Sequence, residues 1–324
     1  MKLAPTVKLN NGYEMPILGL GTYNLKKSRC EAAVCHALQM GYRHIDTAYL
    51  YRNESIIGKV LAKLIGDKII KREQVFLVTK LWDIYHEPKM VKYACEMQLK
   101  LLGVDYIDLY LMHSPVGVDY ISDDDLMPHE NDQLRTNDVD YVDTYKSLEH
   151  LVHLGLVRSL GVSNFNASQL KRLLEHCQVK PVSLQIECHP ELVQIPLIEL
   201  CNMHNITVVA YSPLGRPKAC NPLPEYYTDS KLLALAAKYG KTPAQIILRY
   251  LIDIGTVPIP KAAQRAHLVE NLDIFDFHLT PEELLQLKIF NTERRIWINN
   301  NLYYKSSFQR LSNLSCAFRR CSDI

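Results

Sequence analysis

Short, nearly continuous apolar runs recur along the chain, and each is followed by a segment in which apolar residues repeat every three or four positions. Eight of these runs have the length of a β-strand. Continuous apolar runs, as opposed to alternating ones, are typical of parallel strands that are buried on both faces. The predicted strands are residues 17–23, 44–48, 75–81, 107–113, 157–163, 183–189, 207–212 and 256–261.

The segments between these runs have helical periodicity. Two of them carry an apolar stripe at spacings of three and four residues. The stripes are Leu170, Leu173, Leu174 and Cys177 in one segment, and Met90, Ala94, Met97 and Leu101 in the other. A helix is also predicted to begin at Pro281, because Thr280 and Glu283 form a capping box around a proline at the first helical position.

Eight strands that alternate with helices predict an α/β protein with a (β/α)8 TIM-barrel fold. A doubly wound sheet is the alternative, but the Gly-x-Gly-x-x-Gly turn of a dinucleotide-binding sheet is missing after the first predicted strand. We predict one barrel over residues 1–298 and a separate tail over 299–324. Asn11-Gly12, between two short runs, predicts a β-hairpin before the barrel.

Two stretches interrupt the alternation. Residues 117–142 form a long acidic connection after the fourth predicted strand. Because the loops that follow barrel strands build the active site, we expect this connection to form a wall of the substrate pocket. The segment from Trp297 onward follows the last helix, and we expect its first half to fold back over the barrel mouth and its basic end to be a loose tail.

Composition narrows the class of protein. The 324 residues are 48% hydrophobic and 22% charged, with a formal net charge of +2, which gives no reason to expect binding to nucleic acid or to a membrane surface. No apolar stretch approaches the roughly 20 residues of a membrane-spanning helix. Nine scattered cysteines without a Cys-x-x-Cys pair favour reduced thiols in a cytoplasmic protein. His150 and His153 have no companion ligands, so no metal site is expected.

Polar residues at the ends of three successive predicted strands carry the clearest chemical signal. Asp46 lies near the end of the second strand and Tyr51 follows it, Lys80 lies near the end of the third, and His113 ends the fourth. A nearby ammonium group favours ionisation of a phenol, a carboxylate keeps a buried lysine charged, and an imidazole can donate a hydrogen bond to an oxygen on which negative charge develops. Together these groups predict a site that donates a proton to a carbonyl oxygen.

Five motifs, in order along the chain, resemble the aldo-keto reductase family over residues 7–298. They are Gly41–Tyr51 (GYRHIDTAYLY), Leu160–Phe165 (LGVSNF), Gln185–Pro190 (QIECHP), Tyr211–Gly215 (YSPLG) and Ile259–Lys261 (IPK). The resemblance implies reduction of a carbonyl group with NADP(H). By resemblance, Tyr51 is the general acid, Lys80 its partner, Asp46 the anchor of Lys80, and His113 the residue that orients the carbonyl.

The resemblance also implies a cofactor site. Ser163, Asn164 and Gln185 would hold the nicotinamide carboxamide, and Tyr211 would stack on the nicotinamide. Thr22 and Asp46 would also lie on the nicotinamide side. Ser212 and Leu214 would contact the pyrophosphate. Lys261 would bind the 2′-phosphate, and Glu270 and Asn271 would bind the adenine. Two positions depart from the family: Ala262 replaces a serine, and His267 replaces an arginine, so one contact to the 2′-phosphate depends on pH. Arg265 is the residue that would compensate.

The same resemblance places Tyr23, Tyr51, Trp82 and His113 around the substrate, together with Tyr49. Ser114 stands where family members for small aldehydes carry tryptophan, which favours a bulkier carbonyl such as a keto-steroid. Three functions stay open: a monomeric NADPH-dependent carbonyl reductase, which we expect, a hydroxysteroid or polyol dehydrogenase that runs in the oxidative direction, and a cofactor-binding barrel without catalysis.

Overall fold

The computed structural model describes residues 3–216 and 223–297, and its centre is one parallel sheet of eight strands. The order across the sheet is β3-β4-β5-β6-β9-β10-β11-β12. The strands are β3 (Leu20–Gly21), β4 (His44–Asp46), β5 (Phe76–Leu81), β6 (Leu109–Met112), β9 (Leu160–Ser163), β10 (Ser183–Glu187), β11 (Thr207–Tyr211) and β12 (Thr256–Pro258). Each lies within one of the eight runs predicted from the sequence.

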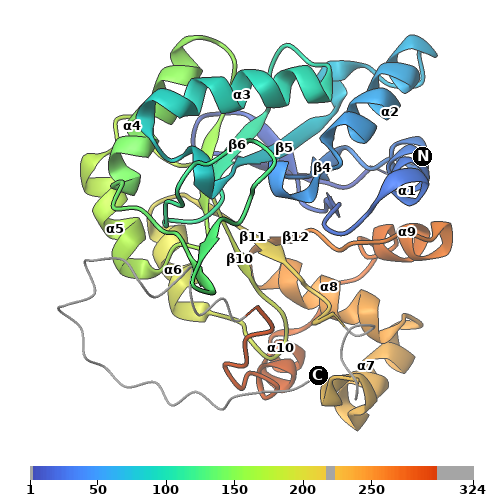
Figure 1. Ribbon diagram of the computed structural model, residues 1–324. Helices are drawn as coiled ribbons and strands as arrows, with labels where there is room; N and C mark the ends of the chain where they lie inside the picture. Colours follow the sequence, from blue (N-terminus) through green and yellow to red (C-terminus); the bar gives the residue numbers. More distant parts are fainter. Residues whose placement is uncertain (1–2, 217–222, 298–324) are drawn as a thin grey trace.

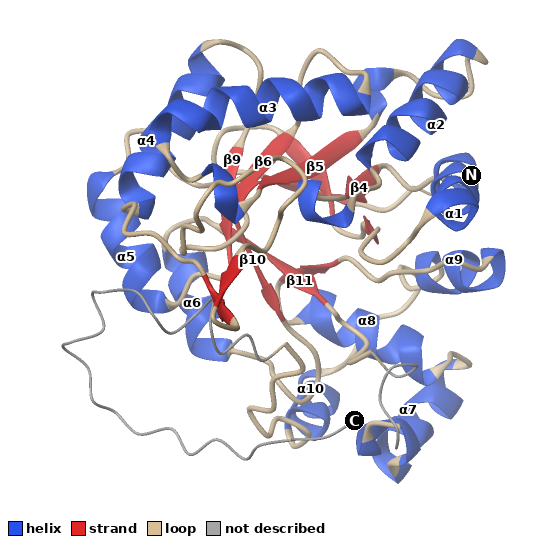
Figure 2. Ribbon diagram, viewed as in Figure 1, coloured by secondary structure: helices blue, strands red, loops and turns tan. Residues whose placement is uncertain are grey.

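The two edges of this sheet meet. The backbone N–H of Gly19 donates to the carbonyl of Pro258 at 3.1 Å, and that of Gly21 donates to the carbonyl of Pro260 at 3.2 Å. Gly21 permits the close approach, because a Cβ atom there would lie 2.6 Å from the carbonyl oxygen of Ile259. The sheet therefore closes into the predicted (β/α)8 barrel, and Figures 1 and 2 show its strands at the centre of the molecule with helices outside them.

Ten helices are described around the strands. They are α1 (Lys27–Met40), α2 (Glu54–Gly66), α3 (Pro88–Leu102), α4 (Tyr141–His153), α5 (Ala167–His176), α6 (Ile195–Met203), α7 (Ser230–Tyr239), α8 (Pro243–Asp253), α9 (Arg265–Leu272) and α10 (Pro281–Lys288). Four short 3-10 turns accompany them: η1 (Tyr49–Tyr51), η2 (Arg72–Gln74), η3 (Asp83–Tyr85) and η4 (Glu225–Thr228). The predicted capping box is present, since Thr280 accepts a hydrogen bond from the backbone N–H of Glu283.

The predicted helix α3 is present, and its predicted apolar stripe was correct in part: Ala94 is buried, and Met90 and Met97 pack against the core. Leu101 is exposed, and the buried stripe runs through Val91, Ala94, Gln98 and Leu102. Gln98 concealed this stripe in the sequence. Its polar side chain can be buried because the core supplies hydrogen-bond partners for it.

A β-hairpin closes the end of the barrel that is opposite the site. Its strands β1 (Thr6–Lys8) and β2 (Glu14–Pro16) pair antiparallel around the Asn11-Gly12 turn, as predicted. The side chains of Asn10 and Asn11 donate hydrogen bonds to backbone carbonyls of the barrel. A second hairpin, β7 (His129–Glu130) with β8 (Gln133–Leu134), belongs to the long connection between β6 and α4. In the part of the chain that the structure describes, no helix is long and apolar enough to cross a membrane.

Candidate functional site

The alternation of side chains along the strands brings the predicted catalytic residues together. On β5, the inward-facing Phe76 and Val78 belong to the barrel core, and Lys80 is the next residue on that face. On the neighbouring β6, the residue two positions after the core residue Leu111 is His113. Because side chains on one face of a strand recur every second residue, both polar groups point into the carboxyl end of the barrel.

Lys80 is completely buried and is held by two oxygen atoms. Its Nζ lies 2.8 Å from Oδ1 of Asp46 and donates to the carbonyl of Thr47 at 2.8 Å. Burial lowers the pKa of Lys80, while the charge of Asp46 and its hydrogen bond oppose that effect. This geometry is compatible with the predicted role of Asp46, which is to keep a buried ammonium group charged.

Tyr51 ends η1, the short turn that follows β4. Its backbone N–H donates to Ala48, and the next residue, Arg52, has a left-handed φ of 53°. The Lys80 Nζ lies 5.1 Å from the centroid of the Tyr51 ring, and the ring of His113 lies 6.0 Å from it in an edge-to-face arrangement. The structure thus brings all four predicted catalytic residues into one cluster.

His113 is a neutral imidazole at physiological pH. Burial lowers its pKa well below the usual value, and Lys80 and His86 act in the same direction. Its ring packs edge-to-face against Trp82, with centroids 4.9 Å apart. A neutral imidazole has one N–H, so His113 can donate a hydrogen bond to a carbonyl oxygen without itself carrying a charge.

The residues predicted for the nicotinamide side form a connected group next to this cluster. The Gln185 amide donates to Oδ2 of Asp46 at 2.8 Å, so Asp46 is shared between Lys80 and Gln185. Asn164, which has a left-handed φ of 63°, donates to the carbonyl of His113 and accepts a hydrogen bond from the Tyr211 hydroxyl at 2.9 Å. Ser163 donates to the carbonyl of Gln185 at 3.0 Å.

Other predicted cofactor residues lie at neighbouring strand ends. The buried Thr22 hydroxyl donates to the carbonyl of Asp46 at 2.9 Å. The carbonyl of Leu214 accepts hydrogen bonds from two tyrosine hydroxyls. Lys261, three residues after β12, and Arg265 at the start of α9 are exposed, whereas His267 is half-buried. On the same helix, Glu270 accepts a hydrogen bond from Thr242, and Asn271 is buried.

The long connection after β6 lies against the aromatic side of the cluster, and in Figure 1 it runs, in green, in front of the strands. The indole N–H of Trp82 donates to the carbonyl of Leu126 at 2.8 Å, and the Tyr49 hydroxyl donates to that of Asp123 at 3.2 Å. Tyr23, which is exposed, packs edge-to-face on Tyr51 with centroids 5.1 Å apart.

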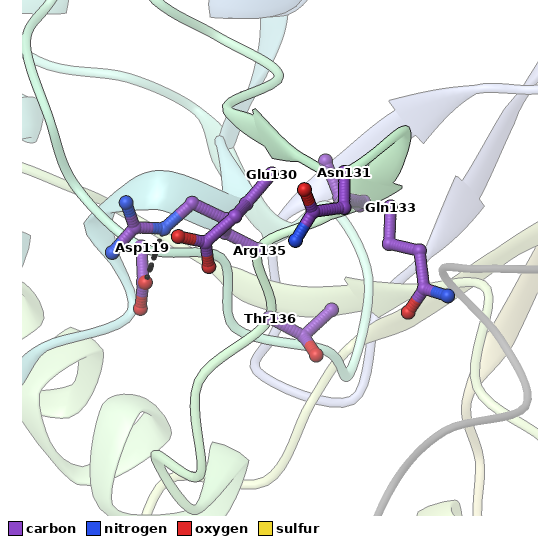
Figure 3. A pocket seen from close by; sticks show the side chains of 7 residues that line it. Asp119, Glu130, Asn131, Gln133, Arg135 and Thr136 are labelled. Carbon is purple, nitrogen blue, oxygen red and sulfur yellow. Dashed lines mark hydrogen bonds and ion pairs between the residues drawn. The ribbon is translucent and has the colours of Figure 1, made fainter.

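This connection also has a polar pocket of its own, with a volume of about 380 Å³. It is lined by Asp119, Glu130, Asn131, Gln133, Leu134, Arg135 and Thr136, and Figure 3 shows the ion pair between Arg135 and Asp119 at its wall. All these residues belong to the connection, so the lining of this pocket includes none of the four clustered residues.

Ser114 does not support the expectation of a widened pocket. Its side chain is buried, and its hydroxyl lies 3.3 Å from the carbonyl of Val116. Among the described residues, no group of three or more histidine, cysteine, aspartate or glutamate side chains could hold a metal ion.

The sequence reasoning did not include Trp297 among the site residues. Its indole packs on Tyr23 with centroids 5.3 Å apart, and its N–H donates to the Ser212 hydroxyl at 2.9 Å. Glu187 holds this segment, because its carboxylate accepts hydrogen bonds from the backbone N–H groups of Ile296 and Trp297. Trp297 therefore lies at the barrel mouth. The rest of the segment, whose first half was expected to fold back over that mouth, lies outside the described residues.

Comparison with known proteins agrees with this geometry. The model of the Aldo/keto reductase family matches residues 17–292, which is most of the chain. The chain belongs to the aldo-keto reductase family. The resemblance that the five sequence motifs indicated is thereby confirmed.

Individual aldo-keto reductases are similar over nearly their whole length. Aldo-keto reductase family 1 member A1 of Bos taurus is 40% identical over 296 residues, which cover 90% of this chain and 91% of that protein. Aldo-keto reductase AKR2E4 of Bombyx mori is 40% identical over 303 residues, covering 90% and 94%. Among solved structures, the aldose reductase of Schistosoma japonicum superimposes with a TM-score of 0.88 at 38% identity, covering 95% of this chain and 100% of that one. The structure of Bombyx mori AKR2E4 in complex with NADP gives a TM-score of 0.86 at 39% identity, covering 94% and 99%.

Proposed function

We propose that this chain reduces an aldehyde or ketone to an alcohol with NADPH, and that Tyr51 donates the proton. The observation that carries the proposal is the position of the Lys80 ammonium group, bonded to Asp46 at 2.8 Å and 5.1 Å from the centre of the Tyr51 ring. A cation beside a phenol stabilises the phenolate that remains after proton donation, so it lowers the barrier to that donation.

The neighbouring residues orient the substrate carbonyl and hold Lys80 in its charged form. His113 donates its N–H to the carbonyl oxygen and thereby orients the carbonyl towards Tyr51. Trp82 holds the His113 ring from the side, and the carbonyl of Leu126 in turn fixes the Trp82 indole. Asp46 keeps Lys80 charged and, through Gln185, connects the proton-donating residues to the cofactor side.

The residues present fit NADPH, which supplies the hydride when it is bound. Tyr211 and Asn164 form a hydrogen-bonded pair directly beside His113, where the nicotinamide would be held with Ser163 and Gln185. Lys261 is an exposed cation three residues after β12, and it would bind the 2′-phosphate with Arg265 or His267. Bombyx mori AKR2E4, which has the same fold, forms a complex with NADP.

For the substrate, we propose a carbonyl compound with a flat apolar substituent, including a keto-steroid. The support is aromatic: Tyr23, Tyr51, Trp82 and Trp297 surround the entrance, and aromatic walls favour flat apolar ligands. Since Ser114 is buried, pocket width adds no support. We also propose a cytoplasmic monomer, which light scattering and fractionation would test.

The direct test is a screen of aldehydes, quinones and keto-steroids in which the loss of NADPH is followed by absorbance. We expect turnover with NADPH, faster with aromatic or polycyclic carbonyls than with short aliphatic aldehydes. Binding of NADPH without turnover of any carbonyl would instead support the non-catalytic barrel. Turnover seen only with alcohols and NADP would support the oxidative dehydrogenase.

A further inference from the structure

A second carboxyl group lies buried close to Lys80 and has no part in the mechanism above. Glu54 is the first residue of α2, three positions after Tyr51, and its side chain is turned into the core with only 2% exposed. A carboxyl group so completely buried is rare unless a charge or hydrogen bonds compensate for the lost water.

Hydrogen bonds link Glu54 to the strand that carries Lys80. Its Oε1 accepts from the Thr79 hydroxyl at 2.6 Å and from the Gln98 amide at 2.7 Å. The same Gln98 amide lies 3.2 Å from the backbone carbonyl of Lys80, and the Tyr110 hydroxyl fixes the other end of Gln98 at 2.6 Å. The position of the Glu54 carboxylate is therefore fixed relative to Lys80.

The charges around Glu54 make its ionisation sensitive to pH near neutrality. Burial raises its pKa to about 7, while hydrogen bonds from Thr79 and Gln98 and the charges of Lys80 and Arg52 favour the anion. The other titratable neighbours stay neutral, because burial raises the pKa of Cys95 to about 12 and that of Tyr110 well above its usual value. Two carboxylates therefore favour the protonated form of Lys80: Asp46, which bonds it directly, and Glu54.

We propose that Glu54 is a second counter-ion of Lys80: a positioning residue whose negative charge keeps the ammonium group protonated while Tyr51 acts as the acid. This inference rests on the proposed function. Glu54 touches neither substrate nor cofactor, so it acts through Lys80. The charge of Glu54 already favours the protonated form of Lys80, as expected for an anion beside a buried amine.

The sign of its effect on catalysis follows from electrostatics alone. In the reductive direction the rate falls at high pH, as the coupled Tyr51–Lys80 pair loses the proton that is to be donated. Above neutral pH Glu54 is an anion, and an anion makes it harder for neighbouring groups to lose a proton. Removal of its charge should therefore move the alkaline fall in rate to lower pH.

Glu54→Gln tests this, because glutamine keeps an oxygen that can accept the hydrogen bonds from Thr79 and Gln98 but loses the charge. We expect the alkaline limb of the kcat profile for carbonyl reduction to shift down by about one pH unit, the lower end of the range for a nearby buried charge. Glu54→Asp, which keeps the charge, should leave the limb close to its wild-type position. Thr79→Ala removes one hydrogen bond that favours the anion and should shift the limb in the same direction by less.

Glu96→Gln on α3 is the matched control, since Glu96 is exposed and pairs only with the exposed Lys92 among the described residues. Its alkaline limb should not move. If Glu54→Gln lowers the rate equally at every pH, or leaves the profile unchanged, the counter-ion role is wrong. If Glu54→Gln does not fold, a Thr79→Ala profile identical to the wild type overturns the proposal. A wild-type protein that reduces no carbonyl contradicts the proposed function instead, so the two failures are distinguishable.

Discussion

At the scale of single residues, Asp46 connects the two halves of the site. One of its carboxylate oxygens accepts from Lys80 and the other from Gln185, and its backbone carbonyl accepts from Thr22. In the proposed mechanism, proton donation and cofactor binding therefore depend on the same short strand, β4. Substitution of Asp46 should disturb both processes. Substitution of Lys261 should affect cofactor binding alone, and substitution of Tyr51 should affect proton donation alone.

Replacement of Lys261 by methionine should weaken NADPH binding much more than NADH binding, because the ammonium group addresses only the 2′-phosphate. A charge-assisted hydrogen bond is worth about 1.5–3 kcal/mol, which corresponds to roughly ten- to a hundredfold in affinity. Fluorescence titration of both cofactors measures the two losses. Lys63→Met, at an exposed position on α2, is the control and should change neither affinity. Equal losses for NADPH and NADH would show that Lys261 has a general structural role.

The four clustered residues could be predicted from the sequence because each lies at or just after the end of an apolar strand. A polar side chain is not needed there for folding, so its presence indicates a function. Polar residues that are buried within helices were harder to predict from the sequence. Gln98 and Glu54 lie within helices whose periodicity they interrupt, and their partners are distant in sequence. The segment that begins at Trp297 was expected at the barrel mouth, but the contacts of Trp297 with Tyr23 and Ser212 were not predictable, since they depend on how the chain returns there.

At the scale of elements, Asp123 fixes the long connection after β6. Its carboxylate accepts hydrogen bonds from the hydroxyls of Tyr85, Tyr93 and Tyr120, and its carbonyl accepts from Arg52. Burial alone would raise the pKa of Asp123, but the tyrosine hydrogen bonds outweigh it and hold the pKa below its usual value. A depressed pKa means that the contact is intact at neutral pH and is lost only as the pH falls through the lowered pKa of Asp123, below the usual range of an aspartate.

Asp123→Ala should release this connection from the aromatic wall of the site. We expect the KM for the carbonyl substrate to rise several-fold with a smaller change in kcat, because Trp82 loses its support while Tyr51 and Lys80 keep theirs. Steady-state kinetics at neutral pH measure both constants. Asp124→Ala, one residue later and exposed, is the matched control. An unchanged KM in Asp123→Ala would mean that the connection does not form a wall of the pocket.

The sequence predicted that this connection lies at the catalytic end, because it follows a barrel strand, but not how it is held. The three tyrosines that bond the carboxylate come from η3, α3 and the connection itself, and Arg52 follows η1, so only the folded barrel brings these groups to Asp123. The buried face of α3 was misread in part for a related reason, since a buried glutamine is indistinguishable from a surface residue until its partners are known.

At the scale of the whole molecule, the fold depends on closure of the sheet between β3 and β12. The topology was predictable because eight apolar runs alternate with helices, and the short β7–β8 hairpin in the long connection after β6 does not join the barrel sheet. Closure was not visible in the sequence, since it depends on the hydrogen bonds of Gly19 and Gly21 to a strand more than 200 residues away. The predicted boundary between the barrel and the tail at residue 298 lies at the edge of the described residues and stays a prediction.

Gly21→Ala should weaken this closure, because the added methyl group would lie 2.6 Å from the carbonyl oxygen of Ile259. Overpacking against a backbone atom costs about 1–3 kcal/mol of the free energy of unfolding. Gly66→Ala is the control: nothing lies within 4 Å of its added methyl group, and alanine in a helix is more stable than glycine by about 0.5–1 kcal/mol. Urea unfolding should therefore show opposite signs for the two variants. A Gly21→Ala protein as stable as the wild type would mean that the closure can relax without cost.

The central claim is that Tyr51 donates the proton, and Tyr51→Phe tests it most directly. The measurement is the rate of NADPH-dependent reduction of the best substrate from the screen, together with the NADPH affinity of the same sample. We predict that the rate falls by about 10²–10⁴, the usual contribution of general acid catalysis, and that the affinity is nearly unchanged. Tyr13→Phe, in the hairpin at the opposite end of the barrel, should keep the full rate. A Tyr51→Phe protein that retains more than about a tenth of the wild-type rate would contradict the claim, because general acid catalysis contributes far more than tenfold.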